Sequence, residues 1–343
     1  MKYRNELIDT ANAMVSEGKG ILAADESNPT CGKRFDLINL ESTAHNRRRY
    51  RNMLLTTPKL EDYISGVILF DETLRQSTLD EVPFPKYLSE KGIIPGIKVD
   101  TGAKDLSLHD GEKITEGLDG LGERLIEYRE LGAKFAKWRA VITIGENIPS
   151  NACIEGNAHA LARYASLCQE QGIVPIVEPE VLMDGDHSIE VCYEVTNKAQ
   201  STLFKHLEIM DVMLEGIVLK PSMVISGKDC ADQADVDTVA SETVRCLKSN
   251  VPENVPGIAF LSGGQSDELA TAHLNTMNAN HKSEMTWSLT FSYGRALQHP
   301  SLMAWAGNDG NEVDSQRILH HRAYCNGLAS KGEYRANIET EMA

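Results

Sequence analysis

The sequence predicts an α/β fold, a single (β/α)₈ barrel with an N-terminal helix and a short C-terminal tail. Eight short apolar runs recur along the chain, segments of helical periodicity lie between them, and successive runs begin mostly about forty residues apart. This spacing leaves room for a loop, a helix and a second loop in each unit. A doubly wound open sheet is the alternative, but the glycine-rich G-x-G-x-x-G turn that follows its first strand is absent.

The length of 343 residues suits one barrel of about 250 residues with extensions. Two domains of roughly 150 residues would also fit, but no Pro-, Gly- or Ser-rich linker divides the chain. We therefore expect a single domain over residues 1–343. Its parts are an N-terminal helix in 1–19, the barrel in 20–300, a helical region in 301–334 and a tail in 335–343.

The first expected element is an amphipathic helix. Apolar residues near the N-terminus recur at helical spacing: Leu7, Ile8, Ala11, Met14 and Val15. Such a pattern predicts a helix with one buried face, which Gly18 or Gly20 ends.

The eight apolar runs follow. Four to six apolar residues without clean alternation are typical of strands buried on both faces, as in parallel sheets. The runs are GILAADES (20–27), GVILFDE (66–72), PGIKVD (95–100), FAKWRAVI (135–142), VPIVEPEV (174–181), GIVLKPS (216–222), GIAFLSGG (257–264) and WSLTFSYGR (287–295). Helical segments between them include 117–132, 157–172, 188–207 and 235–250. Several end with Gly or Asn, which favours a helix C-cap.

Composition excludes several classes of partner. Lys and Arg total 34 against 50 Asp and Glu, a formal charge of −16, so we expect no nucleic acid and no membrane as partners. No segment approaches 18 consecutive apolar residues. The seven cysteines are scattered without a C-x-x-C pair, which predicts reduced thiols and a cytoplasmic location.

Neither the histidines nor the basic run near residue 50 indicates a catalytic or metal site. No H-E-x-x-H occurs and no two histidines share a ligand spacing beside a strand end, so we expect no metal. The basic run NRRRYR (46–51) reads as a solvated helix face or a subunit contact.

Charged residues gather where the predicted strands end, which in such barrels is the active-site face. They are Asp25, Glu26, Lys98, Asp100, Lys137, Arg139, Glu178, Glu180, Lys220 and Arg295. Residues two apart in a strand point the same way. Lys137 therefore shares a face with Arg139, as Glu178 does with Glu180. A structural ion-pair lattice is the alternative, but buried charge is weak evidence for stability.

Lys220 is the candidate nucleophile, because it ends an apolar strand. A lysine attacks a carbonyl only when neutral, and burial together with a second cation such as Lys137 would favour that form. The resulting Schiff base accepts electrons from a breaking carbon–carbon bond. Glu178 is a candidate proton carrier for imine formation, and Asp25 for the hydroxyl at the cleaved carbon.

Two anion sites are also predicted. Ser262-Gly263-Gly264 and Ser292-Tyr293-Gly294-Arg295 follow the seventh and eighth strands, where barrels of this kind bind phosphate. A second cationic cluster comprises Ser27, Thr30, Lys33, Arg34 and Lys98. A solvated helix start is the alternative explanation for that cluster.

Taken together, these motifs resemble the class I (Schiff-base) fructose-bisphosphate aldolases. The resemblance runs from about residue 5 to 334. Its motifs are GILAADES, GVILF, GIKVD, FAKWR, GIVPIVEPE, LKP, FLSGGQS, LTFSYGRAL and GEY.

The resemblance implies a cytoplasmic, homotetrameric, glycolytic barrel enzyme that needs no metal or other cofactor and acts on a phosphorylated ketose. By motif position, Lys220 would form the imine and Glu178 would be the acid/base. Asp25, Lys137 and Glu180 would complete the catalytic set. Phosphate contacts would fall on Ser27, Arg34, Lys98, Arg139, Ser262, Gly263, Gly264, Ser292, Gly294 and Arg295. Thr30 stands where many members have serine, so the second phosphate site departs from the family pattern.

Other functions remain open at this stage. The same lysine chemistry would suit a transaldolase or a pyruvate-type aldolase, although these need only one phosphate site. A barrel that binds phosphosugars as a sensor or scaffold is a further alternative. Such a module would not need a neutral amine beside carboxylates.

Overall fold

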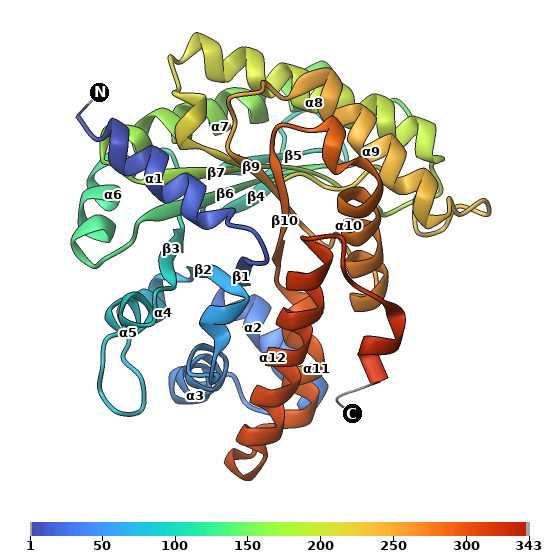
Figure 1. Ribbon diagram of the computed structural model, residues 1–343. Coiled ribbons are helices and arrows are strands. Elements are labelled where there is room, and N and C mark those ends of the chain that lie inside the picture. Colours follow the sequence, from blue (N-terminus) through green and yellow to red (C-terminus); the bar gives the residue numbers. More distant parts are fainter. Residues whose placement is uncertain (1, 341–343) are drawn as a thin grey trace.

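The computed structural model describes residues 2–340, in which eight parallel strands close into a barrel ringed by helices (Figure 1). The strands are β1 (Gly20–Ala24), β2 (Ile64–Leu69), β3 (Ile94–Lys98), β6 (Phe135–Ile142), β7 (Val174–Val181), β8 (Val218–Leu219), β9 (Gly257–Phe260) and β10 (Ser288–Tyr293). Each pairs with the next one named, and β10 pairs back with β1. The predicted barrel is therefore confirmed, and the open sheet, which would leave two edges unpaired, is excluded.

The helices lie around the barrel and across one of its ends. They are α1 (Arg4–Met14), α2 (Asn28–Phe35), α3 (Ala44–Leu55), α4 (Asp71–Leu74), α5 (Phe84–Glu90), α6 (Leu121–Glu130), α7 (Asn151–Glu170), α8 (Ile189–Ile209), α9 (Val236–Asn250), α10 (Asp267–His281), α11 (Arg295–Trp305) and α12 (Glu312–Ala329). Each of the four predicted helical segments overlaps one of them, α6, α7, α8 or α9. Helix α7 begins earlier than expected because Ser150 caps it, accepting a hydrogen bond from the Cys153 N–H at 3.2 Å.

Apolar side chains form two separate layers. Alternate strand residues point inward, among them Ile21, Phe135 and Ile176, and they pack with Leu7 and Met14 of α1 in one buried cluster. The intervening strand residues pack outward against the ring of helices. Helix α1 therefore closes the N-terminal end of the barrel with apolar side chains, as the amphipathic pattern predicts. The opposite end, where the strands finish, is left for polar groups.

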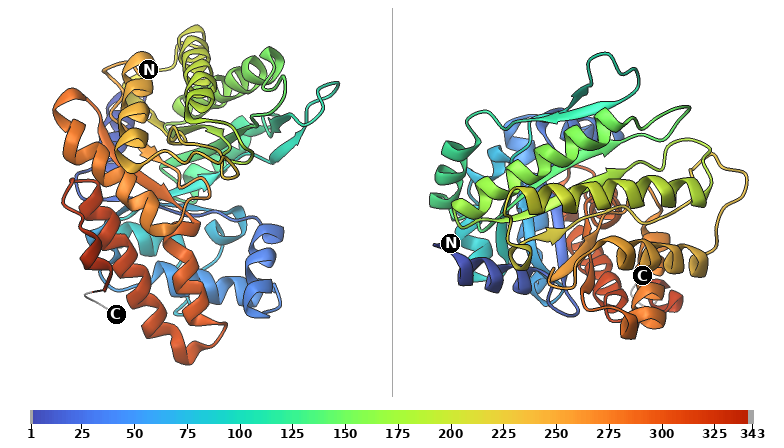
Figure 2. Two further views of the ribbon diagram at one scale, coloured as in Figure 1. Left: turned by 90° about the vertical axis from the view of Figure 1, so that its right-hand side faces the viewer. Right: turned by 90° about the horizontal axis from the view of Figure 1, so that it is seen from above.

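A hairpin that the sequence reading missed projects from the barrel. Strands β4 (Gly102–Asp105) and β5 (Lys113–Glu116) pair antiparallel between β3 and α6, and Figure 2 shows them extending away from the barrel body. Most of the hairpin is exposed, so it carries no apolar run that periodicity would detect. Its base is attached through Thr115, whose hydroxyl donates a hydrogen bond to the Arg139 carbonyl at 2.7 Å.

The basic run 46–51 lies on α3 and is not a simple solvated face. Arg51 is only 2% exposed and pairs with Glu26 at 2.8 Å. The other three arginines also make ion pairs with partners distant in the sequence, Arg47 with Glu72, Arg48 with Glu81 and Arg49 with Asp309. The expectation of a solvated face is therefore wrong for Arg51, because a carboxylate from the end of β1 draws its guanidinium inward.

The predicted tail begins with structured residues. Ala336–Thr340 form a short 3₁₀ helix, η6, and Glu339 pairs with Arg322 of α12 at 2.5 Å. Residues 341–343 of that tail lie outside the described residues. The division of the chain at 300 and 334 stays a prediction.

Two other expectations concern the cysteines and membrane-spanning helices. All seven cysteines are free thiols, and six of them are buried. Among residues 2–340, no helix combines the length and apolar content that crossing a membrane requires.

The floor of the barrel yields a first prediction. A Cβ added at Gly96 of β3 would lie 2.3 Å from the Phe135 ring, whereas a Cβ at Gly122 of α6 would meet nothing within 4 Å. Gly96→Ala should therefore destabilise the protein by about 1–3 kcal/mol, the usual cost of overpacking a filled core. Gly122→Ala, the matched control, should be neutral or slightly stabilising. Thermal unfolding of the two variants measures the difference, and equal melting temperatures would contradict the tight contact at Phe135.

Candidate active site

Inward-facing positions change from apolar to charged toward the C-terminal ends of the strands. On β6 the inward series runs Phe135, Lys137, Arg139, and on β7 it reaches Ile176 and then Glu178. The register of the two strands places Arg139 opposite Glu178. The two-residue repeat that buries apolar side chains at the floor therefore delivers these ionisable groups to the barrel mouth.

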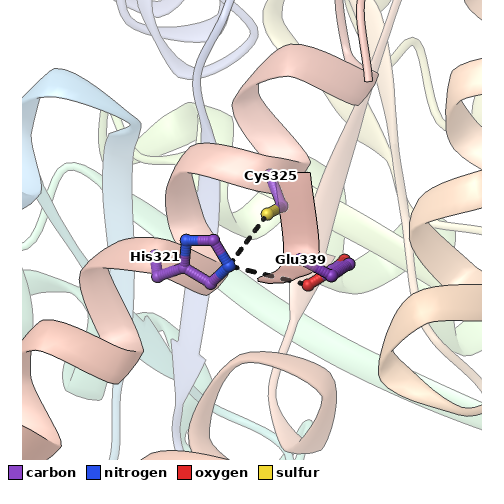
Figure 3. Close-up of side chains that lie close together, drawn as sticks. All are labelled: His321, Cys325 and Glu339. Carbon is purple, nitrogen blue, oxygen red and sulfur yellow. Dashed lines mark hydrogen bonds and ion pairs between the residues drawn. The ribbon is translucent and has the colours of Figure 1, made fainter. Parts of the chain in front are cut away.

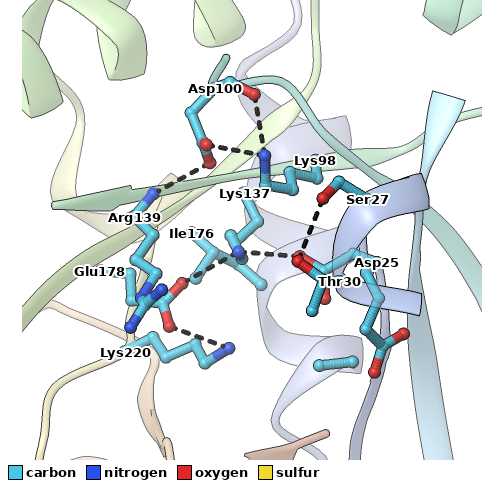
Figure 4. Close-up of polar contacts among 12 residues, drawn as sticks. Asp25, Ser27, Thr30, Lys98, Asp100, Lys137, Arg139, Ile176, Glu178 and Lys220 are labelled. Carbon is cyan, nitrogen blue, oxygen red and sulfur yellow. Dashed lines mark hydrogen bonds and ion pairs between the residues drawn. The ribbon is translucent and has the colours of Figure 1, made fainter. Parts of the chain in front are cut away.

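Four charged side chains form the centre of this mouth (Figure 4). Glu178 lies between two lysines, with Oε1 3.2 Å from the Lys220 Nζ and Oε2 3.5 Å from the Lys137 Nζ. Lys137 also contacts the Asp25 carboxylate at 2.8 Å. Lys220, Glu178 and Lys137 are each no more than 4% exposed. Two lysine amines and two carboxylates thus alternate in a chain of buried or nearly buried contacts.

The backbone fixes the Lys220 side chain at this position. Strand β8 is only two residues long, and the Lys220 N–H donates to the Val177 carbonyl at 2.8 Å just beyond it. Pro221 follows and has no N–H to continue the ladder. The strand therefore ends at Lys220, with its amine aimed into the charged centre.

Asp25 and Lys137, which contact each other, both have strongly shifted pKa values. Burial would raise the pKa of Asp25, but the neighbouring Lys137 and Lys220 cations outweigh it and hold that pKa well below its usual range. For Lys137, burial favours the neutral amine, yet Asp25 and Glu178 raise its pKa well above the ordinary value. Asp25 is therefore ionised and Lys137 protonated across the physiological range.

A second pair of contacts borders the centre. Lys98 of β3 lies 2.7 Å from Asp100, and Arg139 pairs with Glu180. Asp100 also accepts a hydrogen bond from the Arg139 backbone N–H at 3.3 Å, so it bridges β3 and β6. Burial lowers the pKa of Arg139, but Glu180 more than compensates and raises it.

Glu26 organises the outer part of the mouth. Its carboxylate is buried and contacts Arg34 and Arg51, each at 2.8 Å. Arg51 extends from α3 behind the site and is not exposed to it. Sequence reasoning missed Arg51, because nothing in the run 46–51 distinguishes the one buried arginine from its neighbours.

Two adjoining cavities open at the strand ends. One, of about 300 Å³, holds Lys220 and Glu178 together with the turn Ser262-Gly263-Gly264, Ser292 and Arg295. Gly263 and Gly264 adopt φ of 58° and 98°, which lets the turn present backbone to the cavity. Ser292 is only 1% exposed, and its hydroxyl has no hydrogen-bond partner among the described residues.

The second cavity, of about 280 Å³, lies beside β1 and β3. Ser27, Thr30 and Lys98 are among its lining residues. Ser27 occupies the N-cap position of α2, and its hydroxyl lies 3.1 Å from that of Thr30. Both cavities share Asp25, Lys137, Arg139, Arg34 and Gly294. The two spaces are therefore halves of one elongated site with the charged centre between them.

All residues predicted for the site line one cavity or both. They are Asp25, Ser27, Arg34, Lys98, Lys137, Arg139, Glu178, Glu180, Lys220, Ser262, Gly263, Gly264, Ser292, Gly294 and Arg295. Lys33, from the predicted cationic cluster, is exposed and lines neither. Asp100 lines the second cavity and was recognised from the sequence only as a charged strand-end residue.

Comparison with known proteins identifies relatives over nearly the whole chain. The family model described as fructose-bisphosphate aldolase class-I matches residues 6–343. A protein of Xanthomonas campestris named probable fructose-bisphosphate aldolase class 1 is 60% identical over 331 residues, covering 96% of this chain and 98% of its own. The cytosolic fructose-bisphosphate aldolase 4 of Arabidopsis thaliana is 50% identical, covering 97% and 85%.

A solved structure agrees with these matches. Fructose-bisphosphate aldolase from Plasmodium falciparum, crystallised with TRAP and a small-molecule inhibitor, superposes with a TM-score of 0.96 at 49% identity. The alignment covers 98% of this chain and 96% of that one.

The Asp25–Lys137 pair predicts a pH dependence of stability. A carboxylate whose pKa is lowered in the folded state stabilises the fold fully above its unfolded pKa of about 3.9, and loses that contribution as pH falls through the folded value. Wild type should therefore exceed Asp25→Asn in melting temperature at pH 6, and the gap should shrink steadily below about pH 4. In a Lys137→Met background the pH-dependent gap should be much smaller, because the largest cationic contribution to the Asp25 pKa is removed. A gap that is independent of pH would contradict the pairing.

Proposed function

The chain belongs to the class I fructose-bisphosphate aldolase family, and we propose that Lys220 is the amine through which it cleaves fructose 1,6-bisphosphate reversibly to dihydroxyacetone phosphate and glyceraldehyde 3-phosphate. One observation carries the assignment of the site: Lys220 lies 3.2 Å from Glu178 inside a buried cluster with Lys137 and Asp25. A Schiff-base mechanism is typical of the family.

The first step is a proton transfer within the Lys220–Glu178 pair. Lys220 must be neutral to attack, and Glu178 Oε1 is near enough to take the proton from its Nζ. The free amine then adds to the ketose carbonyl at C2, which gives a carbinolamine. Protonated Glu178 returns its proton to the carbinolamine hydroxyl, which leaves as water. The products are an iminium on Lys220 and an ionised Glu178.

Carbon–carbon cleavage needs a base on the other side of the centre. Asp25, held as a carboxylate by Lys137, takes the proton of the C4 hydroxyl. The C3–C4 bonding electrons flow into the iminium, the aldehyde leaves, and an enamine remains on Lys220. Protonation of the enamine at C3 and hydrolysis then release dihydroxyacetone phosphate. Lys137 stays protonated throughout and stabilises the developing negative charge.

The two cavities support a bisphosphorylated substrate. Ser262, Gly263, Gly264 and Arg295 offer hydroxyl, backbone and guanidinium donors on the Lys220 side. Ser27 and Lys98 offer donors on the opposite side of Asp25. A transaldolase or pyruvate-type aldolase needs only one such site, and a sensor does not need the amine–carboxylate pair. Two phosphate sites flanking the pair therefore favour the bisphosphate.

Assembly and location complete the proposal. The resemblance to the family implies a homotetramer, which light scattering on the purified protein tests directly. A cytosolic location is supported by the cytosolic name of the Arabidopsis relative. Neither feature changes the chemistry within one barrel.

Trapping identifies the imine-forming residue. Borohydride reduction in the presence of dihydroxyacetone phosphate should fix the ligand on Lys220, as read by peptide mapping. Lys137, which lines the same cavity as Lys220, and Lys98, which lines the adjoining one, serve as internal controls. An adduct on either control would overturn the role of Lys220, and the absence of any adduct would favour the sensor.

Glu178→Gln should slow imine formation far more than it weakens substrate binding. The change removes a proton carrier and keeps the shape of the side chain, and general acid–base catalysis typically contributes about 10²- to 10⁴-fold. Rapid-mixing measurement of imine formation, alongside equilibrium binding, separates the two effects. Glu130→Gln, on the exposed face of α6, is the control. A variant that changes only KM would make Glu178 a binding residue.

Arg295→Ala should weaken phosphorylated ligands selectively. A charge-assisted hydrogen bond to phosphate contributes about 1.5–3 kcal/mol, which corresponds to roughly 10- to 150-fold in affinity. A dephosphorylated analogue should bind the variant and wild type equally well. Arg317→Ala, on exposed α12 surface, should change neither affinity. Equal losses for both ligands would show that Arg295 has only a structural role.

A further inference from the structure

A second cluster of ionisable side chains lies outside the barrel mouth, where α12 meets the short helix η6 (Figure 3). It consists of His321, Cys325 and Glu339, whose ligand atoms all lie within 4.8 Å of one another. None of the three lines either active-site cavity. The cleavage chemistry proposed above therefore leaves this cluster without a role.

The cluster is assembled from two segments. His321 and Cys325 are four residues apart on α12, so the helical repeat places them on one face. Glu339 comes from the C-terminal segment and is the third member of the cluster. Cys325 is fully buried, and the His321 and Glu339 side chains are only 13% and 14% exposed. Imidazole, thiolate and carboxylate are the three donor types that zinc accepts.

The distances fit a tetrahedral ion. Zinc bonds of about 2.0–2.3 Å at tetrahedral angles separate neighbouring ligand atoms by roughly 3.4–3.6 Å. Here the His321 Nε2 lies 3.6 Å from the Cys325 Sγ and 3.7 Å from the Glu339 Oε2. The same ring nitrogen faces both partners, which is the arrangement expected if Nε2 is a ligand. The third pair, Cys325 Sγ and a Glu339 carboxylate oxygen, lies within 4.8 Å.

Glu339 is held in place by donors of its own. The Tyr334 hydroxyl donates to its Oε1 at 2.9 Å, and Arg322 contacts both carboxylate oxygens at 2.5 Å. Arg322 is anchored in turn by the Thr271 hydroxyl at 2.7 Å. Hydrogen bonds of this kind orient a ligating carboxylate, and Arg322 also offsets the charge of the two anionic ligands. The carboxylate is therefore directed toward His321 before an ion arrives.

We propose that His321, Cys325 and Glu339 form a site for a zinc-type divalent cation that ties the C-terminal segment to α12. Binding exchanges the Cys325 S–H bond for an Sγ–metal bond and releases the thiol proton to solvent. Three protein ligands leave a fourth position for water, as in zinc sites that are not purely structural. The His321 Nδ1 has no hydrogen-bond partner in the described chain, so the site lacks one usual support for tight binding. We therefore expect the metal ion to bind this site reversibly.

Cobalt(II) provides the direct test, because a cobalt–thiolate bond gives a charge-transfer band in the near ultraviolet that zinc lacks. The full-length protein, titrated with Co²⁺ alone, should develop this band with one equivalent bound and lose it when Zn²⁺ is added. Cys325→Ser should abolish the band. Cys230→Ser, which changes a partly exposed cysteine outside the cluster, should leave it intact.

Glu339→Gln supplies an independent test that leaves the helix core untouched. It should retain the thiolate band but lower cobalt affinity at least about tenfold. In wild type, Zn²⁺ should slow amide hydrogen exchange in residues 336–340, and in Glu339→Gln it should not. Absence of the band in wild type, or its persistence in Cys325→Ser, would overturn the site. Unchanged affinity in Glu339→Gln would remove the C-terminal segment from it.

None of these readouts depends on cleavage of a sugar phosphate. Failure of the metal proposal would therefore leave the assignment of Lys220 standing. Equally, trapping on another lysine would not affect the result with cobalt.

Discussion

The arrangement of this barrel depends on one constraint: charges placed in its interior must be paired. A lone ammonium or carboxylate at the position of Lys220 or Glu178 would carry a desolvation cost of several kcal/mol. Each of the four charged groups at the centre of the mouth instead contacts an opposite charge, and Glu178 contacts two. The same pairing places the Glu178 carboxylate 3.2 Å from Lys220, the amine that we propose as the nucleophile. The contacts that stabilise the buried charges are therefore the same ones that the proposed chemistry uses.

That constraint also explains how the two ends of the barrel differ. Because the mouth is occupied by ionised groups, the apolar part of the interior is confined to the floor. Phe135 fills the space beside Gly66 and Gly96, and α1 closes the end below with residues such as Leu7. The floor contributes hydrophobic burial and the mouth contributes function. A long strand is unnecessary for this, since β8 is only two residues long and Lys220 follows it directly.

The sequence predicts those features that depend on local order. Apolar runs mark the strands, and the two-residue repeat shows that Lys137 and Arg139 share a face. The sequence does not reveal contacts between segments far apart, such as that of Glu26 with Arg51. Glu26 follows another carboxylate and Arg51 belongs to a run of arginines, so residue type alone does not single out either one. The β4–β5 hairpin escapes notice for a related reason, since an exposed hairpin needs no apolar pattern. The docking of Glu339 on Arg322 likewise depends on tertiary packing alone.

The distribution of charge explains how a strongly anionic substrate reaches a site inside an acidic protein. The ion pairs around the centre balance: Lys98, Lys137, Arg139 and Lys220 against Asp25, Asp100, Glu178 and Glu180. Arg34 shares Glu26 with Arg51, so that group carries one excess positive charge. Arg295 makes no ion pair with any carboxylate of residues 2–340, although it lines the cavity.

The excess positive charge therefore lies at the rim, on Arg34 and Arg295, and the reacting centre is formally neutral. Phosphate groups are therefore attracted to the rim, away from Lys220 and Glu178. In the proposed imine formation, Lys220 transfers a proton to Glu178 and regains a positive charge as the iminium when water departs. The centre thus returns to its starting charge before the carbon–carbon bond breaks. An electron sink is created without any net charge entering the dry part of the barrel.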